Sequence, residues 1–216
     1  MNADPKGENK RPLVIACGAI AHELVAVLGA SSLERAVDIT CLPAEWHNTP
    51  QHIAPAIEKL LKEASKTDRQ CFVAYGDCGT GGELDRVLAT HAAERLPGPH
   101  CYSFFAGADR FNALAEAEIG SLWLTDYLAR NFERLILEGL GIKKHPELLH
   151  TYFEHYTRVV WLVQQYDSKT EQAAHAAAGA LNLPLLIEQD CMPAFAHSLS
   201  ASVIPLLPAE TLTHNG

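Results

Sequence analysis

Cysteine and histidine residues recur where short apolar segments of the chain end. Cys17 lies near the end of the first such segment, His47 comes just after the second, and Cys78 directly follows the third. Thiolate and imidazole are common ligand types at zinc sites, and both also suit iron. These residues therefore predict a metal site of Cys17, His47 and Cys78, with Cys101 or a water molecule as the fourth ligand. None of the pairs has CxxC spacing, so only the fold can assemble the site.

The segment around Cys78, YGDCGTGGELD, combines an acid, a thiol and glycines at a predicted strand-to-helix junction. The backbone N–H groups of Gly79, Gly81 and Gly82 are suited to an anion at a helix N-terminus, which makes them cofactor-binding candidates. The segment lacks the Lys-Ser/Thr pair of a P-loop and the GxGxxG spacing of a dinucleotide site, so its support for a phosphate is weak. A cysteine at a helix N-terminus is instead stabilised as the reactive thiolate. The neighbouring Asp77 opposes that ionisation unless a cation is present.

Two carboxylates near these segments are candidates for proton transfer. Glu23 lies six residues after Cys17, near the start of a predicted helix, and Asp77 directly precedes Cys78. A carboxyl group held beside a metal-bound substrate can act as general acid or base, so we predict a catalytic role for Glu23 or Asp77. A solvated or capping role explains Glu23 equally well.

A repeated strand-then-helix pattern positions these residues. The apolar segments, each followed by a stretch with helical spacing, are 13–20, 37–44, 71–77 and 100–107. Strands that are apolar on both faces are typical of a parallel sheet covered by helices, so we predict an α/β fold. Ligands in such sheets bind beyond the carboxyl ends of the strands. The fourth segment is an exception, because His100 and Cys101 stand at its beginning, which leaves open which of the two is a ligand.

The second half of the chain contains longer amphipathic stretches. Those with helical spacing are 121–141, 145–165 and 168–182. Ser168 is a suitable N-cap for the last of them, a final strand is predicted at 184–189, and no element is predicted after Asp190. The complete prediction is a parallel sheet of about four to five strands flanked by helices, with a helical C-terminal half. We expect a single α/β domain, 13–216, after a flexible tail, 1–12.

The composition is that of an ordinary globular protein, with 216 residues, 48% of them hydrophobic and 20% charged. The formal net charge of −9 argues against nucleic acid or an anionic membrane as a partner, since both require clustered Lys and Arg, and favours small molecules or proteins. No apolar run reaches the roughly 18 residues of a membrane span and no secretion signal is present, so we expect a cytoplasmic protein. The cysteines are then expected to be reduced, with Cys41 and Cys71 buried inside strands. The apolar C-terminal half is compatible with homo-oligomers, although buried helix faces explain the same pattern.

A set of motifs along most of the chain identifies a relationship. The motifs are ACGAIAHEL, LPAEWHNTP, YGDCGTGG, PGPHCYSFF, GSLWLTDYLARNF and HPELLHTYFEHYTRVVWLVQQ. Together they resemble a conserved domain-of-unknown-function family of bacteria and methanogens, over about 13–186. The recurring Cys, Glu, His and Cys positions of that family match Cys17, Glu23, His47 and Cys78. Many members have His-Asp-Cys in the fourth motif, where this chain has a histidine directly followed by a cysteine.

The resemblance implies a role in one-carbon metabolism, because members are often encoded near corrinoid-dependent methyltransferases and their corrinoid carrier proteins. It implies a metal site, with zinc preferred and iron as the alternative. In methyl transfer, zinc would lower the pKa of a bound thiol substrate or polarise a methyl acceptor. The chain has no DxHxxG motif of its own, so any corrinoid would be supplied by a partner protein.

Three functions are compatible with these observations. The first is a metal-dependent methyltransferase, or an auxiliary protein of corrinoid-linked methyl transfer. The second is a metal-dependent hydrolase or lyase acting on a small molecule, with the metal activating water. The third is a non-enzymatic carrier of a metal or cofactor. Three protein ligands and an open fourth position would favour catalysis, whereas four protein ligands would favour a structural or storage role.

Overall fold

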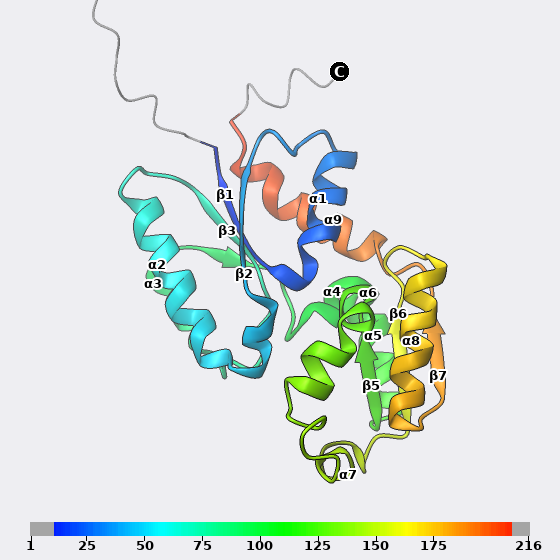
Figure 1. The fold of residues 1–216 in the computed structure, drawn as a ribbon. Coiled ribbons are helices and arrows are strands. Elements are labelled where there is room, and N and C mark those ends of the chain that lie inside the picture. The colour runs from blue at the N-terminus through cyan, green and yellow to red at the C-terminus, as the bar shows by residue number, and fades with distance from the viewer. Residues whose placement is uncertain (1–10, 209–216) are drawn as a thin grey trace, which may run out of the picture.

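The structure is a computed structural model that describes residues 11–208. Its strands form two parallel sheets with helices packed around them, which confirms the predicted α/β class (Figure 1). The predicted flexible tail lies outside the described residues except for Arg11 and Pro12. Among the described helices, none has the length and apolar character needed to cross a bilayer.

The first sheet contains the three strands predicted nearest the N-terminus and one further short strand. These are β1 (Leu13–Cys17), β2 (Asp38–Leu42), β3 (Cys71–Ala74) and β4 (Glu94–Arg95). They are all parallel and lie in the order β2-β1-β3-β4, with Leu13 paired to Asp38 on one side and to Cys71 on the other. The central strand β1 is buried along its whole length, as expected when helices cover both faces. The prediction that Cys41 is buried is wrong, because β2 is an edge strand and this cysteine is exposed.

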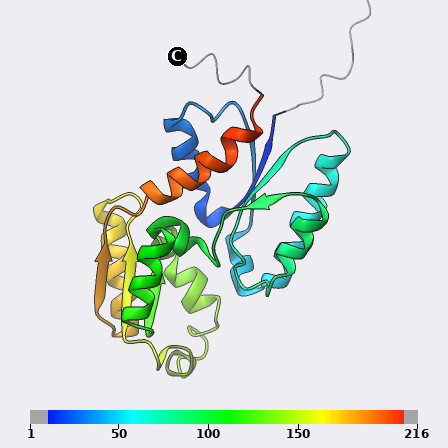
Figure 2. The same ribbon diagram turned by 180° about the vertical axis from the view of Figure 1, so that it is seen from behind.

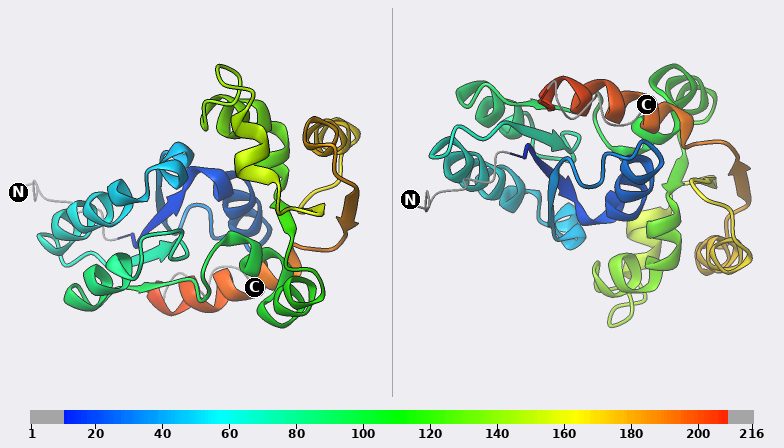
Figure 3. Two further views of the ribbon diagram at one scale, coloured as in Figure 1. Left: turned by 90° about the horizontal axis from the view of Figure 1, so that it is seen from below. Right: turned by 90° about the horizontal axis from the view of Figure 1, so that it is seen from above.

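Four helices cover the first sheet. They are α1 (Ala21–Ala30), α2 (Ile53–Ser65), α3 (Glu83–Thr90) and α9 (Pro193–Val203). The pair α2 and α3 packs on one side of the strands, and the pair α1 and α9 packs on the other (Figures 1 and 3). Helix α9 forms where no element was predicted, and Figure 2 shows it running back from the second sheet to the first. Its buried residues Phe195, Leu199 and Val203 are four apart, so one apolar face joins the core.

The second sheet comes from the C-terminal half. Its strands, in spatial order, are β5 (Ser121–Leu124), β6 (Arg158–Leu162) and β7 (Leu185–Glu188), all parallel. The surrounding helices are α5 (Ala108–Ala117), α6 (Asp126–Arg130), the π-helix η4 (Glu133–Glu138), α7 (Leu148–Phe153) and α8 (Ser168–Leu181). Strand β7 and helix α8 confirm two predicted elements, although Asp167 rather than Ser168 caps α8.

Strand β6 separates two apolar cores. Val160 and Leu162 point into the larger core, which continues over β1, β3 and α9. Val159, Trp161 and Val163 point the other way, into a smaller core closed by α8. Because successive side chains of a strand alternate between faces, β6 is buried on both sides. The larger core therefore runs from the first sheet to one face of the second.

Three predicted elements differ from the structure. The predicted strand 100–107 is the helix α4 (Cys101–Ala106), a short apolar segment buried from several sides, which periodicity cannot distinguish from a strand. The predicted helices 121–141 and 145–165 each contain a strand, β5 and β6 respectively. These strands have four and five residues, too few to change the apolar pattern of the surrounding sequence. The remaining elements are the short 3-10 helices η1 (Gly18–Ile20), η2 (Ala44–Asn48), η3 (Pro50–His52) and η5 (Ile204–Leu206).

Candidate functional site

The carboxyl edge of the first sheet holds the end of β1 and the loops after β2 and β3. The strand order places β1 between β2 and β3, and a sheet of this kind binds ligands at the edge where its connections diverge. Cys17 is the last residue of β1 and caps η1, with its Sγ accepting a hydrogen bond from the Ala19 N–H at 3.3 Å. Its place in the central strand and this cap hold Cys17 at the centre of the edge.

His47 lies on η2, directly after β2. Its Nδ1 is 2.9 Å from the carbonyl oxygen of Ala44 and 3.9 Å from Cys17 Sγ. The carbonyl can only accept, so Nδ1 carries the proton and Nε2 keeps the lone pair that a metal or substrate would use. The ring stacks on Tyr75, with ring centroids 6.4 Å apart. Burial lowers the pKa of His47, but the neighbouring Cys78 and the Ala44 carbonyl outweigh this effect and hold the pKa above its usual value.

The loop after β3 is locked against the loop that leads into α4. The Cys78 N–H donates to the Pro99 carbonyl at 2.9 Å. Gly76 comes so close to His100 that a Cβ at this glycine would lie 2.7 Å from the His100 Cα. These two backbone contacts place Cys78 beside Cys101, the first residue of α4. Helix α4 brings Cys101 to this edge, whereas the ring of His100, the residue before it, packs against Tyr102 and Phe111.

Three thiols and one imidazole therefore converge, and we call Cys17, His47, Cys78 and Cys101 the cysteine-histidine cluster. Burial raises the pKa of Cys17 to about 11. Burial also raises the pKa of Cys101, and the nearby Cys78 and Cys17 raise it further. Ionising several of these thiols together is unfavourable without a cation, because like charges in a buried site repel. A bound cation would remove that penalty.

The donor chemistry of the cluster fits a thiophilic metal ion, although its side chains do not stand in ligating positions. Within residues 11–208, no three His, Cys, Asp or Glu side chains are placed closely enough to hold an ion. The bond from His47 Nδ1 to a backbone carbonyl is the outer contact that metal-binding histidines commonly make. Metal binding would require these side chains to move closer together. The predicted ligand set therefore stays a prediction.

Asp77 and the glycines after Cys78 form a closed loop of their own. The Asp77 carboxylate accepts hydrogen bonds from the Thr80 hydroxyl at 2.6 Å, from Gly82 N at 2.8 Å and from Gly81 N at 3.2 Å. These donors, the hydroxyl first, hold the pKa of Asp77 below its usual value. Gly79, Gly81 and Gly82 all have positive φ, which turns their N–H groups inward. The place that a phosphate would take is thus filled by the chain's own carboxylate.

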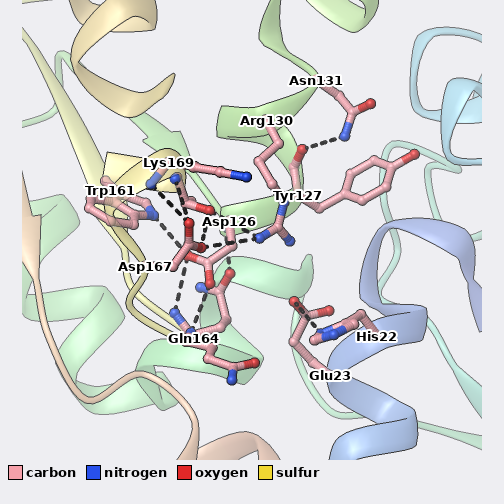
Figure 4. A network of polar contacts seen from close by, with 12 residues as sticks. His22, Glu23, Asp126, Tyr127, Arg130, Asn131, Trp161, Gln164, Asp167 and Lys169 are labelled. Carbon is pink, nitrogen blue, oxygen red and sulfur yellow. Dashed lines mark hydrogen bonds and ion pairs between the residues drawn. The ribbon is translucent and has the colours of Figure 1, made fainter. Parts of the chain in front are cut away.

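Glu23 lies in the first turn of α1, with 3% of its surface exposed. Its Oε2 is buried without a hydrogen-bond partner among the described residues, and Oε1 is 4.0 Å from His22 Nδ1 (Figure 4). Burial raises the pKa of Glu23, and the negative charge of Asp126 adds to the effect. A carboxyl group in this state holds its proton to a higher pH than an exposed glutamate does.

The Glu23→Gln variant is expected to be more stable than the parent chain at pH 7, by about 1–2 kcal/mol. The folded state binds the Glu23 proton more tightly than the unfolded state, so the carboxylate costs stability as pH rises above its unfolded pKa. The gain should therefore shrink toward pH 4, where Glu23 is protonated in both states. Urea unfolding at both pH values measures it, with the exposed Glu34→Gln as the matched control. A gain of equal size at the two pH values would contradict the raised pKa.

A cavity of about 220 Å³ adjoins the cysteine-histidine cluster. Its lining comes from η1, η2, α4, the carboxyl end of β5, α6 and the π-helix η4. The lining residues are Ala19, Ala44, His47, Asn48, Cys101, Tyr102, Thr125, Tyr127, Leu128, Leu135 and Ile136. Two cluster members, His47 and Cys101, thus face a space that is open to a small molecule. The π-helix in its wall is a rare element that is frequent at functional sites.

Sequence patterns gave no indication of the buried network that supports the far wall of this cavity. Asp126 is 1% exposed, and its Oδ1 accepts a hydrogen bond from Trp161 Nε1 at 2.8 Å. Its Oδ2 accepts from Gln165 N at 2.7 Å, and Gln164 N is 3.3 Å from Oδ1 (Figure 4). The network ties the carboxyl end of β5 to that of β6. The only trace in the sequence is Asp126 itself, two residues after the apolar segment SLWL, inside the predicted helix 121–141.

Comparison with known proteins identifies a family. A sequence profile of the family described as "Protein of unknown function (DUF1638)" matches residues 41–199. This span includes His47, Cys78 and Cys101 and begins after Cys17 and Glu23. No curated protein and no solved structure matches the chain.

Proposed function

The chain belongs to the DUF1638 family of proteins of unknown function, and we propose that it is a metal-dependent protein whose cysteine-histidine cluster binds zinc, with iron as the alternative. The observation that carries the proposal is the convergence of three thiols and one imidazole beside an open cavity. Cys17, His47 and Cys78 would be the ligands, and Cys101 or a water molecule would complete the set.

The cavity favours an enzyme over a carrier. A structural or storage site is closed on all sides, whereas a catalytic site keeps one position open to substrate. Two members of the cluster, His47 and Cys101, line the cavity, so a molecule bound there would reach the cluster directly. The metal would supply Lewis-acid chemistry, polarising a bound group or lowering its pKa.

The residues around the cluster have separate roles in this proposal. The Ala44 carbonyl fixes the tautomer of His47 and so orients Nε2. Glu23 is the candidate for holding a proton, because it is buried and its pKa is raised. Asp77 has a different role, since its carboxylate is committed to Thr80 and the glycine N–H groups and shapes the loop that carries Cys78.

The finer proposal is that the reaction belongs to corrinoid-linked methyl transfer. It is supported by the resemblance of the motifs and by donor types suited to a thiol or a methyl acceptor. Incubation of the metal-loaded protein with a methylated corrinoid protein and a series of thiol acceptors tests it. We expect demethylation that is lost in His47→Ala. No demethylation with any acceptor would instead favour hydrolysis or elimination on a small molecule, or a carrier role.

Metal content is the decisive measurement for the proposed site. We expect the parent chain, purified without added metal, to hold about one metal ion per chain, and Cys17→Ala, His47→Ala and Cys78→Ala to lose most of it, because each removes a ligand. Elemental analysis measures the content and identifies the metal. Cys41→Ala is the matched control, since Cys41 is an exposed cysteine on β2 outside the cluster. Full occupancy in all three ligand variants would refute the site.

Cobalt substitution then separates the two choices for the fourth ligand. Each thiolate bound to cobalt adds to the charge-transfer absorption of the protein, whereas water adds none. If Cys101 is a ligand, Cys101→Ala should reduce this absorption as much as Cys78→Ala does. An unchanged spectrum in Cys101→Ala would leave the fourth position to water or substrate and strengthen the case for catalysis.

A further inference from the structure

The cavity beside the cluster has an unusual absence of charge on its lining. Among its lining residues there is no Lys, Arg, Asp or Glu, although the whole chain has a formal charge of −9. Leu128, Leu135 and Ile136 form an aliphatic wall, and Tyr102 and Tyr127 contribute aromatic rings. An ionised group placed against the aliphatic wall would lose its hydration without gaining a countercharge from that wall.

The cations nearest this wall are already committed. Arg134 pairs with Glu45 and donates to the Tyr127 hydroxyl at 3.3 Å. Arg130 donates to Thr170 Oγ1 at 3.1 Å and lies 3.8 Å from the carboxylate of Asp167. Neither guanidinium lines the cavity. A carboxylate or phosphate would therefore have to break an existing ion pair to reach either guanidinium.

The polar side chains of the wall are committed in the same way. Asn48 Nδ2 donates to the Leu135 carbonyl at 3.1 Å. Thr125 Oγ1 accepts from Leu128 N at 3.2 Å as the N-cap of α6. The two cluster members in the lining, the His47 ring and the Cys101 thiol, can meet a polar group of the ligand.

The volume limits the ligand to a small molecule. A dry protein cavity of about 150 Å³ holds benzene, so about 220 Å³ corresponds to roughly ten non-hydrogen atoms. A nucleotide or a corrinoid is far larger than this space. The cavity is also too small for an extended peptide segment.

We propose that this cavity binds a small uncharged molecule, with an apolar body against Leu128, Leu135 and Ile136 and one polar end at His47 and Cys101. The role of this cavity as the substrate site of the metal centre rests on the proposed function. The class of ligand that the cavity binds depends only on its lining residues. The polar end is the part that would meet the metal, and the aliphatic wall sets the orientation. Discrimination against charge on the body of the ligand comes from the missing countercharge along the aliphatic wall.

Binding of three probes of similar size tests the ligand class. Benzyl alcohol is neutral, benzoate is an anion and benzylammonium is a cation. Saturation-transfer NMR titrations on the metal-free full chain should show benzyl alcohol binding at least about 10-fold more tightly than either ion, because the lining residues include no Lys, Arg, Asp or Glu to pair with a charge. Benzoate binding as tightly as benzyl alcohol would overturn the proposal.

Two variants locate the binding in the cavity. Ile136→Trp fills the space and should abolish benzyl alcohol binding, whereas Ile119→Trp, the same change at a residue with 92% exposure, should leave it intact. Equal binding in the two variants would place the probe elsewhere and refute the site. The titrations are repeated on Cys78→Ala, which leaves the lining residues unchanged. If benzyl alcohol still binds more tightly than both ions in this variant, the ligand class stands even where the metal proposal fails.

Discussion

The Asp126→Ala variant is expected to unfold with a free energy about 3–5 kcal/mol below that of the parent chain. The Asp126 carboxylate is the acceptor for Trp161 Nε1 and for the backbone N–H groups of Gln164 and Gln165. Removing it leaves three donors without this partner, two of them buried, and each buried donor without a partner costs about 1–3 kcal/mol. Urea unfolding at 25 °C measures the difference.

Asp167→Ala is the matched control for this prediction. The Asp167 carboxylate also accepts two backbone hydrogen bonds, from Lys169 N and Thr170 N, both at 2.9 Å. Its side chain is 46% exposed, so water can replace the lost acceptor, and the expected cost is that of an ordinary N-cap, about 1 kcal/mol. If Asp126→Ala costs no more than Asp167→Ala, the buried network does not hold β5 to β6 as proposed.

The Asp126 network also connects stability to the cavity. Thr125 and Tyr127, the residues on either side of Asp126, both line the cavity. Loss of the carboxylate frees the carboxyl end of β5 and with it this part of the wall. In folded Asp126→Ala protein we therefore expect weaker binding of benzyl alcohol, even though Asp126 itself does not reach the cavity.

The first sheet was predictable because its central strands are short apolar segments followed by amphipathic helices. β1 and β3 are almost wholly buried, because helices cover the sheet on both faces, and strands in such a sheet are apolar throughout. The second sheet was missed for a physical reason. Trp161 alternates with Val160 and Leu162 across two apolar cores, so β6 is apolar throughout and resembles a continuation of the helical stretch before it.

The candidate site was predictable in part. Cys17, His47 and Cys78 follow three strands of one parallel sheet, and the rule for carboxyl ends places them together. The role of Asp77 was not accessible, because the sequence does not show whether glycine N–H groups face a ligand or a neighbouring carboxylate. The cavity was also inaccessible, since its far wall is built by α6 and η4 from the second half of the chain.

Gly76→Ala is the second variant with a large expected effect. A Cβ at this position would lie 2.7 Å from the His100 Cα and 2.8 Å from the Pro99 carbonyl oxygen. Both are backbone atoms, so no side-chain rotation can relieve the clash, and the two loops must separate. We expect the free energy of unfolding to fall by about 1–3 kcal/mol. Gly29→Ala is the control, because nothing lies within 4 Å of its Cβ position in α1, and it should gain up to about 1 kcal/mol.

The same substitution tests the cluster without touching a ligand. Separating the loops breaks the hydrogen bond from Cys78 N to the Pro99 carbonyl and moves Cys78 away from Cys101. Elemental analysis of folded Gly76→Ala protein should therefore show reduced metal content, while Gly29→Ala keeps the parent value. Gly76→Ala with full metal and parent stability would show that the loops need not touch. The cluster would then have to form without Cys101, because the contact between these loops is what brings Cys101 to Cys78.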